Sequence, residues 1–185
     1  MLEHKGTQVI RTGRLVLRPF VKADAAPMFR NWASDPEVTK FLTWPTHARE
    51  EISQLVVDSW VDGYREDNFY QWAITLRERP DEPIGSISVV RIEEHIDAVE
   101  IGYCMGRQWW HQGIMSEALG GLIGFLFTQV GVNRIVAHHD PNNPHSGGVM
   151  KKCGMTYEGT FRQAGRNNQG ICDICQYALL REDRK

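Results

Sequence analysis

The stretch from Ala98 to Val130 constrains the fold most, because a strand pattern, a short turn with glycine and a long amphipathic helix follow one another directly. In A-V-E-I-G-Y-C-M, every second side chain from Val99 onward is apolar or aromatic, which predicts a strand over residues 98–105. A stripe with helical spacing follows and predicts a helix over residues 116–130. The stripe consists of Leu119, Leu122, Ile123, Leu126, Phe127 and Val130. Glycines lie among these residues, and close approach of the helix to a sheet would explain them.

The turn between the strand and the helix reads H-Q-G-I-M-S, residues 111–116. A helix N-terminus carries unpaired backbone N–H groups and a partial positive charge, so it attracts phosphate. A second helix start, N-P-H-S-G-G at residues 143–148, follows after one strand over residues 134–139. Two such helix starts favour a long phosphorylated cofactor. The spacing alone leaves an ordinary strand–helix turn open as the alternative.

Periodicity and turn residues predict an α+β fold for the whole chain. The further predicted strands cover residues 14–20, 69–77, 84–93, 155–164 and 171–180, and the further helices cover residues 22–34, 47–66 and 144–153. Turns are expected at residues 79–83 and 94–97. We expect a single domain over residues 1–185, with residues 1–11 as a short N-terminal extension.

Composition argues against several classes of protein. The net charge is −2 and the basic residues are scattered, so no nucleic-acid partner is expected. No apolar run approaches the roughly 18 residues of a membrane span, and the start M-L-E-H-K-G lacks the apolar region of a signal peptide. The four cysteines form no disulfide framework, which favours a cytoplasmic protein. Cys172 and Cys175 would point to opposite faces of a strand, so no metal site is expected.

Three short patterns resemble those of one enzyme family. W-H-Q-G-I-M-S-E-A at residues 110–118 is similar to a cofactor signature in which His111 takes the place of a usual glycine. A second signature is matched by Asn143, Ser146, Val149, Lys152, Gly154 and Met155. T-x-R-L-x-L-R at residues 12–18, with Asp24 after it, matches a third. Over residues 12–182 the chain resembles the GCN5-related N-acetyltransferases (GNAT), in the branch of the ribosomal-protein alanine N-acetyltransferases.

This resemblance implies a GNAT fold, with a mixed, mostly antiparallel sheet of about seven strands and about four flanking helices. It also implies direct acetyl transfer from acetyl-CoA to a primary amine, with no metal. The pyrophosphate would lie on the turn, the pantetheine arm along the end of the strand and against Asn143, and Ser146 would donate to the departing sulfur. The expected cofactor-binding residues are Tyr103, Cys104, Met105, His111, Gln112, Gly113, Ile114, Met115, Ser116, Asn143 and Ser146.

Glu100 is the candidate general base, because a carboxylate on a strand otherwise made of small and apolar residues is unusual. A structural acid, paired with an arginine or lying at a solvated edge, is the alternative. His138 and His139 are rival bases, and Tyr157 or Tyr177 could replace Ser146 as the acid. Capping and helix initiation alone would explain Asn143 with Pro144. A covalent route through Cys104 or Cys153 is the enzymatic runner-up.

The acceptor is less constrained than the cofactor. Phe41, Leu42, Trp44 and Pro45 are candidates for an apolar wall. The acidic run over residues 50–67 would attract a polyamine or an aminoglycoside, or it is simply a solvated helix face. The branch resemblance favours the N-terminal amine of a protein or peptide. A CoA-binding sensor without catalysis is the alternative of a different class. The oligomeric state stays open, a homodimer included.

Overall fold

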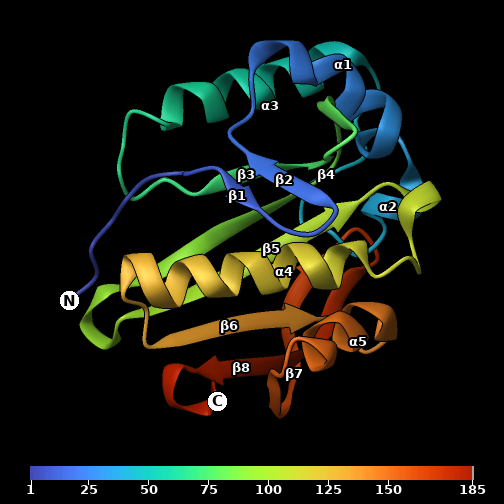
Figure 1. Cartoon of the computed structure of the whole chain (residues 1–185). Coiled ribbons are helices and arrows are strands. Elements are labelled where there is room, and N and C mark those ends of the chain that lie inside the picture. Colours follow the sequence, from blue (N-terminus) through green and yellow to red (C-terminus); the bar gives the residue numbers. More distant parts are fainter. Residues whose placement is uncertain (185) are drawn as a thin grey trace.

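A computed structural model describes residues 1–184 and shows one mixed sheet with helices on both faces (Figure 1). In sheet order the eight strands are β1 (Ile10–Arg11), β2 (Leu15–Arg18), β3 (Gln71–Leu76), β4 (Arg79–Glu93), β5 (Ala98–Met105), β6 (Arg134–His139), β8 (Gly170–Leu180) and β7 (Thr156–Asn167). Among the strands of residues 1–184, only β5 and β6 pair in parallel. The predicted α+β class is confirmed, with one strand more than the expected seven.

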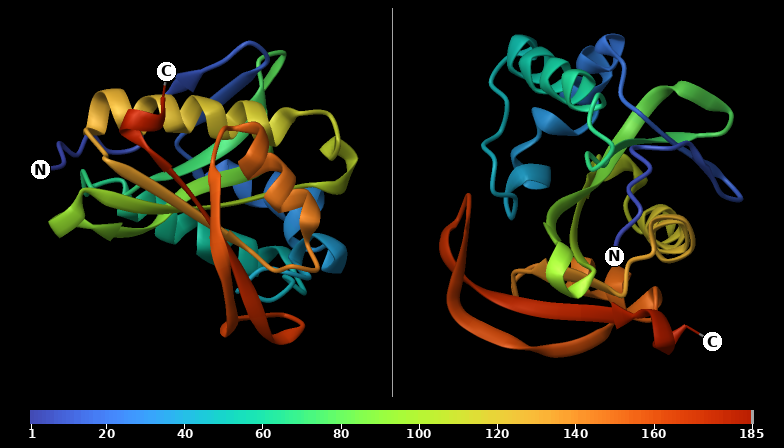
Figure 2. Two further views of the ribbon diagram at one scale, coloured as in Figure 1. Left: turned by 90° about the horizontal axis from the view of Figure 1, so that it is seen from below. Right: turned by 90° about the vertical axis from the view of Figure 1, so that its left-hand side faces the viewer.

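The described residues form five α-helices, which are α1 (Ala25–Met28), α2 (Pro36–Thr39), α3 (Glu50–Gly63), α4 (Ile114–Phe125) and α5 (Pro144–Lys152). α4 lies on one face of the sheet, and α1 and α3 lie on the other (Figure 2). The expected helix over residues 22–34 is a composite, because a 3-10 turn precedes α1 and a π turn follows it. The expected helix over residues 47–66 is α3, three residues shorter at each end.

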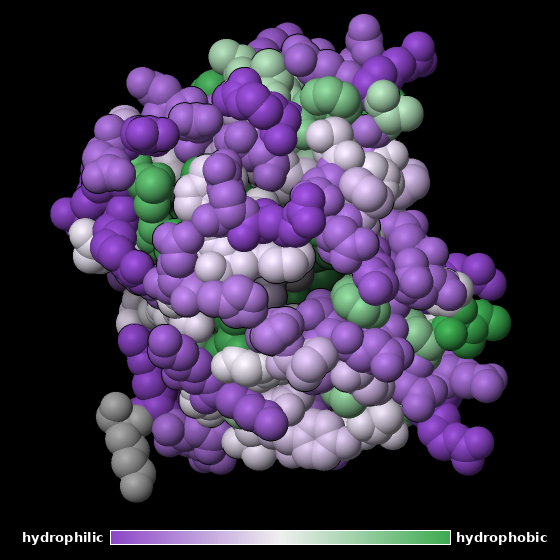
Figure 3. All heavy atoms as spheres, turned by 90° about the vertical axis from the view of Figure 1, so that its right-hand side faces the viewer, coloured by the Kyte–Doolittle hydropathy of each residue, from purple (hydrophilic) through white to green (hydrophobic). Residues whose placement is uncertain are grey.

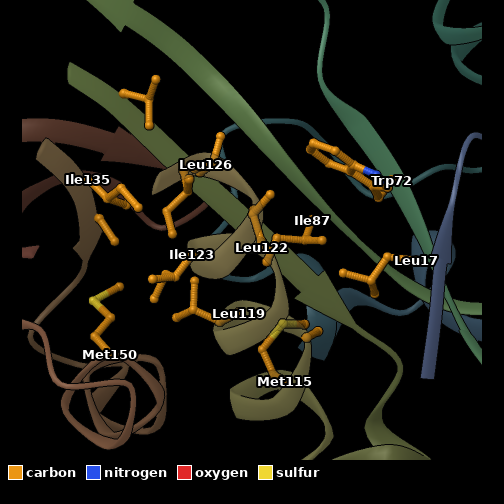
Figure 4. Packing of buried hydrophobic residues seen from close by; sticks show 14 of the residues in the cluster. Leu17, Trp72, Ile87, Met115, Leu119, Leu122, Ile123, Leu126, Ile135 and Met150 are labelled. Carbon is orange, nitrogen blue, oxygen red and sulfur yellow. The ribbon is translucent and has the colours of Figure 1, made fainter. Parts of the chain in front are cut away.

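α4 anchors the larger core. All six residues of the predicted stripe are at most 6% exposed. Figure 4 shows Leu119, Leu122, Ile123 and Leu126 packed against the strands. Burying each large apolar side chain contributes about 1.5–3 kcal/mol. The expected close approach holds for Gly121, where an added Cβ would come within 2.9 Å of Thr12. It is wrong for Gly120, which is exposed with nothing within 4 Å of that position.

The predicted strands over residues 98–105 and 134–139 are confirmed to the residue as β5 and β6. α4 begins two residues earlier than expected, at Ile114, and ends in a π turn over Leu126–Val130. The expected turn at residues 79–83 is wrong, because these residues form the start of β4. Its two prolines are tolerated there because β4 pairs with β5 only from Gly85 onward, and bulges interrupt its pairing with β3.

Two features of the fold open a space at the middle of the sheet. The pairing of β5 with β6 ends at Ile101 and Ala137, so the last residues of β5 face no neighbouring strand on that side. The β7–β8 hairpin curves toward α2, as Figure 2 shows. At its tip, Asn168 donates to the backbone oxygens of Thr39, Leu42 and Trp44 at 2.8–3.2 Å. The hairpin therefore closes over the space that the strands leave.

Candidate active site

Two cavities meet where β5 and β6 part. The first, which we call the turn cavity, has a volume of about 350 Å³ and lies between the turn before α4 and the start of α5. The second, the strand cavity, has about 570 Å³ and lies between β5, β6 and the β7–β8 hairpin. Both are lined by Phe41, Leu42, Tyr103, Cys104, Asn143 and Ser146. A recess with an apolar floor opens on the end of the molecule that carries α2 and α5 (Figure 3).

The turn before α4 presents backbone donors to the turn cavity. The first amide bonded within the helix is that of Glu117, which donates to Gly113 O at 3.1 Å. The amides of residues 114–116 precede it and have no partner inside the helix. His111 has a φ of 60° and Gly113 a φ of 72°, both in the left-handed region that favours glycine. His111 thus keeps the turn that a glycine would make, at a cost of about 1–2 kcal/mol.

Cationic side chains surround this turn, and the sequence reasoning did not assign them to the site. A Cβ on Gly113 would lie 3.5 Å from Lys152 Nζ and 3.6 Å from an Arg14 guanidinium nitrogen. His111 and His145 stack edge to face across the cavity mouth, with ring centroids 4.8 Å apart. Lys152 belongs to one of the recognised signatures, and that position was the signal that could have identified it. The positive charge suits an anionic ligand.

The junction of the cavities carries two hydroxyl groups. Tyr103 Oη donates to Ser146 O at 3.0 Å and lies 3.1 Å from Ser146 Oγ. Burial raises the pKa of Tyr103, so its hydroxyl keeps its proton. Tyr103 is therefore a donor beside Ser146, whereas Tyr157 and Tyr177 line neither cavity. The Asn143 side chain makes no capping bond to α5, so capping alone does not explain this residue.

The glycines of α5 have separate reasons. An added Cβ on Gly147 would come within 2.5 Å of His139 Nε2, so this glycine lets α5 pack on β6. An added Cβ on Gly148 would meet nothing within 4 Å, and Gly148 lines the turn cavity. Only the second glycine keeps space free for a ligand.

Glu100 lies on the wall of the strand cavity with 27% of its side chain exposed. It does not pair with an arginine, which was one of the two structural alternatives; its Oε1 is 3.1 Å from His138 Nδ1. The hydrogen bond to Glu100 is the main reason that the pKa of His138 is raised. The structure thus joins the candidate base to one of its two rivals. His139 Nδ1 instead lies 2.8 Å from Asp140 O.

The walls of the strand cavity bear on the acceptor. Phe41, Leu42 and Trp44 line it as expected, and Pro45 does not. None of the six acidic residues between Glu50 and Asp67 lines either cavity.

Cys172 lines the strand cavity, while Cys175 is buried. Across residues 1–184, no three His, Cys, Asp or Glu side chains are grouped as metal ligands would be. In the same range no helix has both the length and the apolarity of a membrane span.

A set of hydrogen bonds around Glu117, which we call the brace, holds the turn in place and explains the N-terminal T-x-R pattern. Glu117, in the first turn of α4, accepts bonds from Thr12 Oγ1 at 2.6 Å, Arg14 N at 2.7 Å and Arg14 Nε at 2.6 Å. Arg14 also donates to Gln112 O in the turn at 2.9 Å. Burial opposes ionisation of Glu117, but these bonds together outweigh it and lower its pKa. The β1–β2 hairpin thereby positions the amides of the turn.

Comparisons with known proteins place the chain in a family. Residues 14–156 match the model of the acetyltransferase (GNAT) domain, so the chain belongs to the GNAT acetyltransferases and is an N-acetyltransferase by family. It is 32% identical to the uncharacterised N-acetyltransferase p20 of Bacillus licheniformis over 95% of this chain and 98% of that protein.

Two further relatives have more specific descriptions. The chain is 36% identical to a ribosomal-protein-serine acetyltransferase of Escherichia coli over 55% of this chain and 57% of that protein. Its fold matches a solved ribosomal alpha-N-protein acetyltransferase in complex with coenzyme A, with a TM-score of 0.82, 22% identity and coverage of 94% and 98%. The predicted family is thus confirmed, and the ribosomal-protein branch agrees with these relatives.

The brace makes a testable contribution to stability. The folded-state pKa of Glu117 is lowered, so the carboxylate stabilises the fold above the ordinary glutamate pKa of about 4.3 and loses this effect as the pH falls through the folded-state value. We expect Glu117→Gln to lower the free energy of unfolding by about 1–2 kcal/mol at neutral pH and by less near pH 3.5. Urea denaturation measures both. Glu3→Gln, which removes an exposed pair with Lys5, is the control; an equal loss at both pH values would contradict the brace.

Proposed function

We propose that the protein transfers an acetyl group from acetyl-CoA directly to a primary amine, and that the preferred acceptor is the N-terminal amine of a protein or peptide. The observation that carries this proposal is the meeting of two cavities at Tyr103 and Ser146. One cavity has the donors and cations that suit a phosphorylated cofactor. The other has a carboxylate and a histidine that suit the removal of a proton from an amine.

The cofactor would enter through the turn cavity. Its pyrophosphate would accept bonds from the amides of residues 114–116, with Lys152 and Arg14 beside it. Its pantetheine arm would run along the end of β5, where no strand covers Tyr103–Met105 on the β6 side. Asn143, whose side chain has no capping bond, faces this path. The thioester would then lie at the junction of the two cavities.

The acceptor would approach from the strand cavity, where Glu100 would take a proton from its ammonium group, through a water molecule. The free amine nitrogen would bond to the thioester carbon, and the carbon–sulfur bond would break. The departing thiolate would receive a hydrogen bond from Ser146 or Tyr103, since a bonded anion leaves more readily, and then the proton that the nitrogen of the new amide loses.

A covalent cysteine route is disfavoured. Burial raises the pKa of the Cys104 thiol to about 11, and burial raises that of Cys153 to about 11 as well. A thiol with such a pKa is almost entirely protonated at neutral pH and is a poor nucleophile. The Cys153 thiol donates to Ser116 O at 3.2 Å, and Cys104 lies beside Ser86, so neither contacts a base.

Three arguments favour a peptide amine over a small polycation. The acidic run on α3 lies outside both cavities, so it does not face the amine. An α-amine has a pKa of about 7.7–8.0 and a lysine amine one of about 10.4, so the α-amine loses its proton at roughly 3–4 kcal/mol lower cost. Two relatives in Escherichia coli, described as a serine and an alanine acetyltransferase, act on ribosomal proteins.

The cofactor position is tested by filling the turn cavity. Gly148→Leu would project a side chain into it, and we expect acetyl-CoA affinity to fall at least tenfold in calorimetric titration. The fold would not suffer, because leucine is favoured over glycine in a helix by about 1 kcal/mol. Gly120→Leu is the matched control, since Gly120 is a helical glycine with equally open surroundings on α4. Unchanged affinity in Gly148→Leu would refute this binding position.

The base is tested by Glu100→Gln. We expect turnover to fall by about 10²–10⁴-fold, as for the loss of a general base, with acetyl-CoA affinity unchanged. Steady-state kinetics and calorimetry measure the two quantities. Glu94→Gln, an exposed position just after β4, is the control. Near-normal turnover of Glu100→Gln between pH 6 and 9 would show that Glu100 is structural.

The acceptor is tested by competition. With peptides that begin with alanine or serine, spermidine and an aminoglycoside, we expect the highest kcat/KM for a peptide, because the acidic run on α3 that a polycation would need lies outside the strand cavity. Release of the CoA thiol measures each rate. A tenfold advantage for either small cation would contradict the peptide preference. Acetyl-CoA binding without transfer to any amine would instead support the CoA-binding sensor.

A further inference from the structure

A continuous row of polar side chains crosses four neighbouring strands, in the sheet order β5, β6, β8, β7. Glu100 on β5 contacts His138 on β6, His138 contacts Gln176 on β8, and Gln176 contacts Glu158 on β7. The distances are 3.1, 2.9 and 2.8 Å. Arg134 on β6 donates to Glu158, which is the last acceptor of the row. The β-bulge between Tyr157 and Gly159 leaves Glu158 as an extra residue of β7, next to Gly159, which is the register partner of Gln176.

The far end of the row fixes the direction of its hydrogen bonds. Arg134 pairs with Glu158 through both guanidinium NH₂ groups, with Nη1 at 2.7 Å from Oε1. This hydrogen bond is the main reason that the pKa of Glu158 is lowered. The carboxylate is therefore ionised and only accepts hydrogen bonds. The Gln176 amide must turn its NH₂ group toward Glu158, so its carbonyl oxygen faces His138.

The orientation of the Gln176 amide determines the tautomer of His138. The Gln176 oxygen accepts, so His138 Nε2 carries a hydrogen. In the neutral ring Nδ1 is then a bare lone pair, and it faces the Glu100 carboxylate. Two acceptor atoms 3.1 Å apart bind one proton strongly between them. Without Gln176, the neutral ring could place its hydrogen on Nδ1 and bond Glu100 in that form.

We propose that Gln176 is a positioning residue, which holds His138 as the Nε2–H tautomer so that Glu100 and His138 Nδ1 together accept the proton of the acceptor amine. This inference rests on the proposed function. The ammonium proton of the acceptor passes to Glu100 and is shared with Nδ1, and the neutral amine then attacks the thioester. The nitrogen of the new amide loses its second proton to the departing thiolate, and the proton held by Glu100 and Nδ1 leaves to solvent after the products depart, so charge and atoms balance.

Other charged groups surround this pair. Arg91 on β4 lies opposite Glu100 in the strand register, and its positive charge lowers the proton affinity of His138. Arg91 is partly neutralised by Glu93 at 3.2 Å. The wall of the strand cavity adds Asp140 and Arg166, one of each sign. The contact with Glu100 outweighs Arg91, because the net effect on the pKa of His138 is upward.

The tautomer is measured by nitrogen NMR of the histidine rings, with His138→Gln to assign the signal. In the wild type we expect hydrogen on Nε2 of neutral His138. In Gln176→Leu we expect the hydrogen on Nδ1 and a titration midpoint lower by about one pH unit, a tenfold change in proton affinity. The double variant Glu158→Gln/Gln176→Glu exchanges donor and acceptor at constant charge, so it should keep Nε2–H with a midpoint at or above that of the wild type.

The wild-type signal alone tests the geometry, whatever the stability of the variants. Hydrogen on Nδ1 in the wild type, or an unchanged tautomer in Gln176→Leu, overturns the proposal. Kinetics test its catalytic part: Gln176→Leu should lower kcat by tenfold or more and move the acid limb of the pH profile with the NMR midpoint, with the KM for acetyl-CoA unchanged. The double variant should recover kcat.

Different results would contradict the positioning role of Gln176 and the proposed acetyl transfer. A switched tautomer in Gln176→Leu together with unchanged kcat and pH profile overturns the positioning role. Absence of transfer by the wild type to every acceptor overturns the proposed function, and the NMR result is independent of that outcome.

Discussion

The parallel pairing of β5 with β6 covers four residues on each strand, and the rest of the site depends on where it ends. Below that point the two strands bury their apolar faces under α4 and form the core. Beyond that point the two strands part and leave a gap in the sheet. Among the described residues, no further strand fills this gap. Hydrogen bonds between distant segments hold the walls of this gap. The Glu117–Arg14 brace holds one wall, and Asn168 holds the hairpin over the other.

Much of this arrangement was predictable from the sequence, because it depends on local patterns. β5, β6 and the buried stripe of α4 follow directly from the periodicity of their apolar residues. α2 was missed although Asp35 before Pro36 is a capping signal, since a helix of four residues has no periodicity to detect. β1 was missed for the same reason. The turn expected at residues 79–83 was wrong because bulges, which depend on strand pairing, admit prolines.

In the candidate site too, local sequence patterns predict some features, and others depend on how the strands assemble. His111, residues 113–116 and Asn143 line the turn cavity because their positions follow from helix starts. Gln112 does not line it, and its side chain instead donates to Gln108 O at 2.8 Å. The contacts of Tyr103 with Ser146, 43 residues apart, and of Glu100 with His138, 38 residues apart, arise only when the strands are assembled. Lys152 and Arg14 likewise meet at Gly113 from distant parts of the chain. A sequence identifies such residues singly, and only register decides which of them face each other.

The charges are divided between the two cavities in a way that fits the two substrates. Lys152 and Arg14 stand at the turn cavity, where an anion would replace the solvent around them. At the strand cavity, Glu100 and His138 together carry no net charge when they share one proton and a single negative charge when they do not. In the proposed reaction, a cationic amine would be attracted by the second form and would convert it into the first as it gives up its proton. The attraction would therefore end when the neutral amine is ready to attack, which would leave the nucleophile free to move to the thioester.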